Sequence, residues 1–157
     1  MGGGTAPLIP WLEAGITVGI GLDERPDMIR FMQHTMGVAA YRSRWLGQGY
    51  RPKAQQVLEL ATIQGAKVLG MDNEIGSLEP NKLADVTIVD MRKGHLTPML
   101  DPVANLVYLA NGNDVENVII DGKIVVENEK IVTVDPLKIL PKTQEAGERA
   151  WNKFYEE

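Results

Sequence analysis

The feature that most constrains the fold is a short apolar segment, Ile-Thr-Val-Gly-Ile-Gly-Leu at residues 16–22, which runs directly into Asp23. Its short length and its β-branched residues are typical of a parallel strand that is buried on both faces. Gly19 and Gly21 remove side chains at alternate positions, so we expect another element to pack closely against that face. A buried parallel strand needs partners on both edges and both faces. The segment therefore predicts a sheet with further strands.

Helices are predicted on both sides of this segment. A short helix is expected at residues 8–12, between Pro7 and Gly15. A second helix begins near Pro26 and carries methionines at 28, 32 and 36 on one face, a spacing that favours core packing over binding of a soft metal. A third helix is expected over residues 54–69, with Gly70 closing it.

The sequence after residue 70 indicates a small β unit followed by a charged helix. The segment 103–110 fits either a helical turn or a strand, because its periodicity does not decide. The pattern 137–157 predicts the last helix, although Pro141 and Gly147 weaken it. The strands are expected at 75–79 and 85–90, and then in a three-stranded meander at 115–120, 123–126 and 130–134.

Charge divides the chain into three blocks. Residues 1–70 have seven basic and five acidic side chains, residues 71–137 have five and twelve, and residues 138–157 have four of each. We therefore expect three structural segments with these boundaries. The acidic middle block argues against a nucleic-acid partner, since its carboxylates would repel phosphates. The basic cluster fits either a solvated surface or an anion site; its members are Arg42, Arg44, Arg51 and Lys53.

Length and composition exclude several classes of protein. The chain has 157 residues and no cysteine, which excludes a disulfide scaffold, a thiolate metal cluster and a cysteine nucleophile. A closed eight-stranded α/β barrel needs about 250 residues, more than this chain supplies. No apolar run reaches the roughly 18 residues that span a bilayer, and the first residues lack a secretory signal. We expect a cytoplasmic protein without a membrane partner.

Four stretches of this sequence resemble one known family. Residues 7–23 read Pro-Leu-Ile-Pro-Trp-Leu-Glu-Ala-Gly-Ile-Thr-Val-Gly-Ile-Gly-Leu-Asp, and residues 74–90 read Glu-Ile-Gly-Ser-Leu-Glu-Pro-Asn-Lys-Leu-Ala-Asp-Val-Thr-Ile-Val-Asp. The stretch His95-x-x-Pro98-x-x-Asp101 and the segment Asn-Val-Ile-Ile-Asp-Gly-Lys at 117–123 also fit. Together they resemble the metal-dependent amidohydrolase superfamily, in its branch of aminohydrolases and chlorohydrolases that act on nitrogen heterocycles.

The resemblance implies a fold that is α/β plus β. Residues 1–70 would be the carboxyl-terminal remnant of a TIM-type (β/α)8 barrel, with 16–22 as its last strand. Residues 71–137 would be part of a small composite β-sandwich, and residues 138–157 a carboxyl-terminal helix. The parent family hydrolyses non-peptide C–N bonds, or C–Cl bonds, on small heterocyclic substrates.

The resemblance also assigns a role to Asp23. In the family, the aspartate that ends the eighth strand binds a divalent metal, zinc or iron, and takes a proton from the attacking water. Asp23 is therefore the expected metal ligand and catalytic residue, and barrel enzymes place such groups at the carboxyl ends of strands. The residues alone also allow Asp23 to be the cap of the helix that starts near Pro26.

The other metal ligands that the family uses are not apparent in this sequence. A catalytic zinc or iron site needs three or more protein ligands, and the only histidines are His34 and His95, with no His-x-His pair. His34 falls in a helix about three turns after Asp23, and His95 is expected to form a hydrogen bond at the seam between the two parts. We therefore expect a carboxyl-terminal fragment that is inactive alone and holds no metal tightly.

Three functional hypotheses remain open from the sequence. The first is the fragment of a deaminase or chlorohydrolase, which would need the absent portion from another chain. Unpaired strand edges and apolar faces would then favour a homo-oligomer with exchanged elements. The second is a non-catalytic, self-associating β-rich module. The third is an anion-binding protein that uses Arg42, Arg44 and Arg51.

Overall fold

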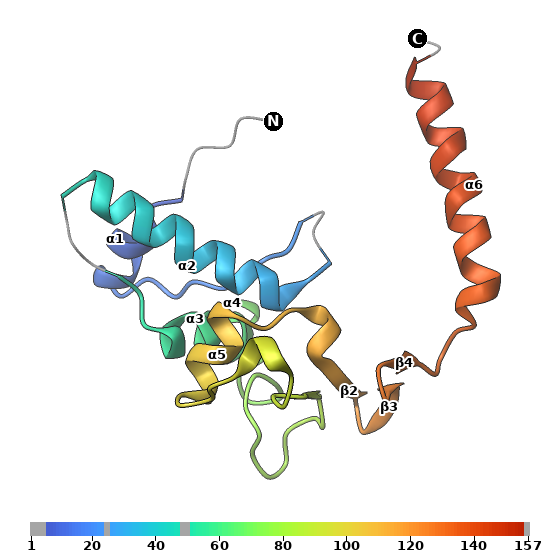
Figure 1. Ribbon diagram of the computed structural model, residues 1–157. Helices are drawn as coiled ribbons and strands as arrows, with labels where there is room; N and C mark the ends of the chain where they lie inside the picture. Colours follow the sequence, from blue (N-terminus) through green and yellow to red (C-terminus); the bar gives the residue numbers. More distant parts are fainter. Residues whose placement is uncertain (1–5, 24–25, 48–50, 156–157) are drawn as a thin grey trace.

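Helices and one small sheet build the chain, and a last helix extends away from both (Figure 1). The computed structural model describes residues 6–23, 26–47 and 51–155. The helices are α1 (Leu8–Glu13), α2 (Met28–Trp45), α3 (Ala54–Leu60), α4 (Ile63–Leu69), α5 (Pro102–Tyr108) and α6 (Pro136–Tyr155). The strands are β1 (Val86–Val89), β2 (Val115–Ile120), β3 (Lys123–Glu127) and β4 (Lys130–Ile131). Two 3-10 turns, η1 (Gly94–Leu96) and η2 (Gly112–Asp114), flank α5.

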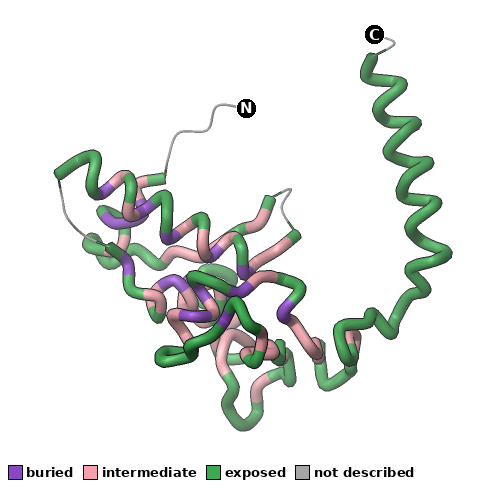
Figure 2. Tube along the Cα trace, viewed as in Figure 1, coloured by how far each residue is buried: buried purple, intermediate pink, exposed green. Residues whose placement is uncertain are grey.

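The main core lies where α2, α3 and α5 meet, and Figure 2 shows the buried residues concentrated there. Met32 and Met36 of α2 are 3% and 4% exposed, which confirms that this methionine face packs in the core. Leu96 and Val107 are fully buried against it. A second cluster joins α1 to α2 and α3; its buried members are Leu8, Ile9, Ala39 and Leu60.

Residues 16–22 are extended but form no strand, so the prediction of a strand here is wrong for the described chain. The physical reason is the lack of a strand beside it among the described residues, since a strand needs a neighbour for its ladder. The segment packs on α3 and α4 instead, and the Ile20 N–H donates to the Leu60 carbonyl at 3.1 Å. A Cβ on Gly19 would lie 2.9 Å from the Gly65 Cα, so the expected close packing is present at Gly19. At Gly21 a Cβ would meet nothing within 4 Å.

Two other predictions from the sequence need correction. The helix expected over 54–69 is two helices, because the chain turns at Ala61 and Thr62, just after the Leu60 carbonyl that binds Ile20. Gly70 ends α4 in the left-handed conformation, as expected. The strand expected at 75–79 is a loop. Gly76 has a φ of +90°, and a Cβ there would lie 2.7 Å from that of Ala66, so this loop packs tightly on α4.

The sheet is an antiparallel meander in the order β1-β2-β3-β4. It confirms the predicted strand at 85–90 and the predicted meander, with β4 shorter than expected. The ambiguous segment 103–110 is mainly helix α5. The Asp101 carboxylate caps α5 by accepting from the N–H groups of Val103 and Ala104, and Pro102 suits the first turn.

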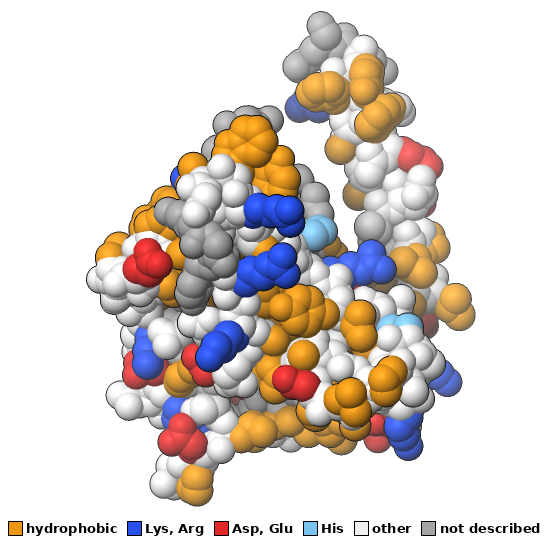
Figure 3. Space-filling view, turned by 60° about the vertical axis from the view of Figure 1, so that its left-hand side comes forward, with side chains coloured by type: hydrophobic (Ala, Val, Ile, Leu, Met, Phe, Trp, Pro, Cys, Tyr) orange, Lys and Arg blue, Asp and Glu red, His pale blue; other side chains and the backbone are white. Residues whose placement is uncertain are grey.

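The last helix, α6, stands apart from the body of the molecule (Figure 1). None of its residues is buried, and Figure 3 shows hydrophobic side chains on this projecting helix. The predicted helix is present even though Pro141, which weakened the prediction, lies inside it. Pro141 removes one helical N–H only, and it lies within the first two turns. Across the described residues, α6 included, we find no helix with the length and apolar character needed to cross a membrane.

Candidate functional site

Asp23 is the residue to which the sequence assigns metal binding and catalysis. It follows the extended segment 16–22, and it is exposed. Its φ of +53° lies in the left-handed region, which a residue other than glycine adopts uncommonly. No hydrogen bond or ion pair joins Asp23 to another described residue. Its carboxylate therefore has no structural role within this part of the chain.

The cap of α2 is Asp27 and not Asp23, so the alternative that Asp23 caps this helix is wrong. The Asp27 carboxylate accepts a hydrogen bond from the Arg30 N–H at 3.0 Å. Its other oxygen accepts from the Gly112 N–H, also at 3.0 Å, and so ties the start of α2 to η2. Asp23 is therefore an exposed aspartate that caps no helix and has a backbone in the left-handed region.

His34 lies on the exposed side of α2, and its ring meets that of Phe31 edge-on at 6.3 Å. It also lines a small apolar depression of about 310 Å³, together with residues of the 16–22 segment. This position fits the expected surface or packing histidine.

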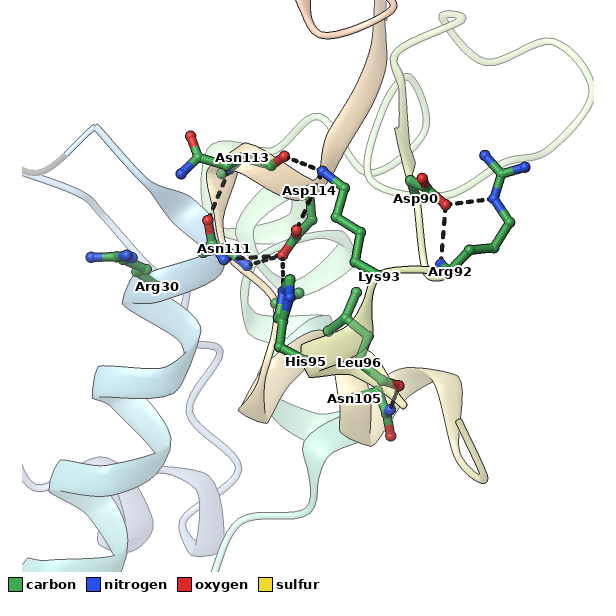
Figure 4. Close-up of polar contacts among 12 residues, drawn as sticks. Arg30, Asp90, Arg92, Lys93, His95, Leu96, Asn105, Asn111, Asn113 and Asp114 are labelled. Atoms are coloured by element: carbon green, nitrogen blue, oxygen red, sulfur yellow. Dashed lines mark hydrogen bonds and ion pairs between the residues drawn. The ribbon is translucent and has the colours of Figure 1, made fainter. Parts of the chain in front are cut away.

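His95 forms a hydrogen bond, as the sequence predicted, but its partner lies within the same segment 71–137 and not across the seam between the two predicted parts. Its Nε2 lies 3.0 Å from Oδ2 of Asp114, whose side chain is 2% exposed (Figure 4). The same oxygen accepts from the N–H of Asn111 at 2.9 Å and from its side-chain amide at 3.1 Å. Lys93 adds a positive charge 3.5 Å from Oδ1.

These contacts set the charge of Asp114. Burial acts to raise the pKa of this carboxyl group, but the hydrogen bonds from His95 and the Asn111 N–H and the charges of His95 and Lys93 outweigh it. The net result is a pKa below the ordinary value. Asp114 is therefore an ionised, fully engaged group, and it acts as an anchor between η1 and η2.

The motif His95-x-x-Pro98-x-x-Asp101 has a structural explanation. His95 binds Asp114, Asp101 caps α5, and the Pro98 carbonyl accepts from the buried Asn105 amide at 3.1 Å. The Asn105 amide also donates to the Leu96 carbonyl at 2.6 Å. Sequence reasoning missed Asn105 and Asp114; the spacing Asn-x-x-Asp at 111–114, which forms a capping box here, was the available signal.

The basic residues that the sequence groups together lie at the end of α2 and just before the start of α3. Arg42 and Arg44 are in the last turn of α2, where positive charge is favoured by the helix dipole. Arg44, Arg51 and Lys53 are exposed. This placement matches the solvated-surface interpretation of the cluster.

The chain belongs to the amidohydrolase family: the profile of that family matches residues 1–125. Among curated relatives, the 5-methylthioadenosine/S-adenosylhomocysteine deaminase of Syntrophomonas wolfei is 40% identical over 155 residues, which are 96% of this chain and 35% of that protein. The 5'-deoxyadenosine deaminase of Methanosarcina mazei is 37% identical over 148 residues, 92% of this chain and 34% of that protein. The chain thus spans about a third of the length of the curated relatives it matches.

Solved structures share the fold over nearly all of the chain. An adenosine deaminase from Xanthomonas campestris with bound zinc has a TM-score of 0.83 at 23% identity, over 92% of this chain and 33% of its own. The zinc complex of atrazine chlorohydrolase from Arthrobacter aurescens has a TM-score of 0.79 at 24% identity, over 89% of this chain and 32% of its own.

The described residues do not by themselves fit the zinc ion that these two solved proteins carry. In the ranges 6–23, 26–47 and 51–155, no three His, Asp or Glu side chains gather closely enough to hold a metal ion. Asp23 alone would fill one position of a site that takes three or more protein ligands. Asp114 and His95 are already engaged with each other and with neighbouring donors.

Proposed function

We propose that this chain provides the last strand and helices of the barrel, and the adjoining sheet, of a metal-dependent deaminase. The segment 16–22 would be the last barrel strand, and the sheet β1–β4 would be part of the small sandwich. The substrate class is a small aminated heterocycle of the adenosine type. The observation that carries the proposal is 40% identity to a deaminase of such nucleosides over 96% of the chain.

Within this proposal, Asp23 is the carboxylate that the chain contributes to the metal site. Its position at the end of the 16–22 segment, its exposure and the assignment of the helix cap to Asp27 support this role. The remaining ligands and the groups that select the substrate come from outside the described residues. We therefore propose that the 157-residue chain has no deaminase activity alone.

A chimera tests the proposal. Residues 7–125 would replace the matching segment of the Syntrophomonas wolfei deaminase, and deamination of 5-methylthioadenosine would be followed by the release of ammonia. We expect the chimera to be active and its Asp23→Asn variant to lose at least about a thousandfold in kcat/KM. A chimera with the control change Asp101→Asn should keep its activity if it folds, because Asp101 only caps α5.

Two results would contradict this assignment. Zinc content and activity that are equal in the chimera and its Asp23→Asn variant would remove Asp23 from the site. Deamination by the purified 157-residue chain, without any added part, would overturn the proposal that it is inactive alone.

A further inference from the structure

The sequence contains one asparagine that is followed by glycine, at Asn111 and Gly112. Asparagine is chemically least stable before glycine, because glycine has no side chain to keep its backbone nitrogen away from the asparagine amide. The reaction is deamidation, in which that nitrogen attacks the asparagine Cγ and the side chain loses ammonia. The pair lies at the start of η2, beside Asp114 (Figure 4). The contacts of Asn111 and Gly112 therefore decide whether the fold permits this reaction.

The fold holds the side-chain amide of Asn111, which is the group that would be attacked. Its oxygen Oδ1 accepts a hydrogen bond from the Asn113 N–H at 3.0 Å. Its nitrogen Nδ2 donates to Oδ2 of Asp114 at 3.1 Å. The donor at Oδ1 polarises the carbonyl and would stabilise the negative charge that develops on this oxygen during attack. The electrophile of the reaction is therefore already in place in the folded chain.

The nucleophile, the backbone nitrogen of Gly112, is held by Asp27. The Gly112 N–H donates to Oδ2 of Asp27 at 3.0 Å, a contact with the start of α2 that joins residues 85 positions apart in the sequence. Attack requires this N–H to lose its proton, and a carboxylate beside it disfavours the resulting negative charge on nitrogen. The carboxylate also lies so close that a Cβ on Gly112 would be 3.2 Å from Oδ2. Asp27 therefore withholds the nucleophile.

We propose that Asn111 is a deamidation site of this chain, which is closed while Asp27 holds the Gly112 N–H and opens when the start of α2 leaves η2. In the open state, the Gly112 nitrogen gives its proton to water and forms a bond to Cγ of Asn111. The Cγ–Nδ2 bond breaks, and Nδ2 leaves as ammonia with a proton taken from water. A second water molecule then opens the cyclic imide, which leaves aspartate or isoaspartate at position 111.

Deamidation at this position weakens the contact between η1 and η2. Asp114 loses the Nδ2 donor of Asn111 and gains a second carboxylate in its place. Because Asp114 is 1% exposed, solvent and salt do little to screen the repulsion between the two negative charges. Closing of the contact with Asp27 does not restore the amide, since ammonia has left. Opening of the start of α2 is thereby recorded as a covalent change at Asn111.

Prolonged incubation of the 157-residue chain at mildly alkaline pH tests the proposal. Mass spectrometry of the tryptic peptide 94–123 measures the deamidation of Asn111, and enzymatic methylation of isoaspartate confirms the product. We expect Asn111 to react at least about tenfold more slowly in the folded chain than in the chain unfolded by urea. Equal rates in the two states would overturn the proposal, because the fold would then withhold nothing.

The variant Asp27→Asn tests the role of Asp27. Asparagine still caps a helix, but it carries no negative charge and offers one oxygen where the two oxygens of Asp27 each accept a separate N–H. We expect deamidation at Asn111 to become at least about tenfold faster. The matched control Asp101→Asn makes the same change at the cap of α5, away from Gly112, and should leave the rate unchanged. Equal rates in the two variants would overturn the proposal.

Two further measurements separate this role from a general loss of structure. Hydrogen exchange in the wild type should show the Gly112 N–H protected at least about tenfold relative to the unfolded chain. An unprotected Gly112 N–H would overturn the proposal even if Asp27→Asn failed to fold. Adding Gly112→Ala to Asp27→Asn should make deamidation slow again, because a Cβ hinders attack by the backbone nitrogen. A rate that stayed high would refute attack by this nitrogen.

The consequence for the fold has its own pair of variants. Asn111→Asp creates the aspartate product directly and should lower the midpoint of urea unfolding, because it places a carboxylate beside the buried Asp114. The control Asn113→Asp makes the same change two residues later, at an exposed position, and should leave the midpoint unchanged. Equal midpoints would show that deamidation at Asn111 does not weaken the contact between η1 and η2.

Discussion

The imidazole of His95 and the carboxylate of Asp114 lie 3.0 Å apart, and this contact connects η1, the turn before α5, to η2, the turn that leads into β2. Asp114 is 1% exposed, so its negative charge depends on the donors around it. A buried carboxylate that loses a hydrogen-bond donor still pays the cost of desolvation, but it no longer has the hydrogen bond that offset this cost. The pair is therefore a structural joint between the helices and the sheet.

Replacing His95 should destabilise the fold. We expect His95→Ala to lower the free energy of unfolding by about 1–3 kcal/mol, because it removes a donor from a buried carboxylate. The control His34→Ala changes the other, exposed histidine and should cost less than about 0.5 kcal/mol. Urea denaturation followed by circular dichroism measures both values. Equal effects of the two substitutions would show that the contact with Asp114 contributes no special stability.

Stability should fall in acid through Asp114. The pKa of Asp114 is lower in the folded chain than its ordinary value, so the folded state favours the ionised form. The stability that Asp114 contributes is fully present above the pKa of an aspartate in the unfolded chain, about 3.9. It is lost as the pH falls through the lower pKa of Asp114 in the folded chain.

Unfolding free energies of the wild type and of Asp114→Asn, measured from about pH 6 to about pH 3, check this expectation. The variant should be less stable at the upper end and should lose less stability as the pH falls. A parallel decline of the two proteins would contradict the role of Asp114.

Local patterns in the sequence predict much of the helical structure. Gly15 follows the end of α1 and Gly70 ends α4, both as expected. The spacing of the methionines in α2 correctly predicts the buried face of this helix. Sequence periodicity fails to predict the local structure where a contact with a residue far away in the sequence determines the backbone conformation. The turn at Thr62 follows a carbonyl bound by Ile20, and the loop at Gly76 is shaped by α4, so neither has a local signal.

The candidate site is predictable only in part, for a similar reason. The end of an apolar segment points to Asp23, and the loop position of His95 suggests a hydrogen bond. The partner of His95 is Asp114, nineteen residues later, and nothing in the local pattern joins the two. The distinction between Asp23 and Asp27 as the helix cap also needs backbone angles, because both precede the helix.

The two glycines of the 16–22 segment should differ in their tolerance of a side chain. Gly19→Ala would bring a Cβ to 2.9 Å from backbone of Gly65, which cannot move away as a flexible side chain can. We expect a loss of about 1–3 kcal/mol in the free energy of unfolding. Gly21→Ala meets open space and should change stability by less than about 0.5 kcal/mol. Thermal and urea unfolding of both variants would decide, and equal tolerance would argue against close packing on α4.

The two aspartates before α2, Asp23 and Asp27, should differ in how much they contribute to the stability of the fold. Asp27→Ala removes the cap of α2 and the acceptor of the Gly112 N–H, so it should lower the free energy of unfolding by about 1–2 kcal/mol. Asp23→Ala should cost less than about 0.5 kcal/mol, because the carboxylate has no bonded partner among the described residues and alanine, like aspartate, keeps a Cβ at φ +53°. Urea denaturation of the two variants, side by side, gives the comparison. A large loss with Asp23→Ala would mean that this carboxylate supports the fold, and its proposed role in a metal site would lose the contrast with Asp27 on which it depends.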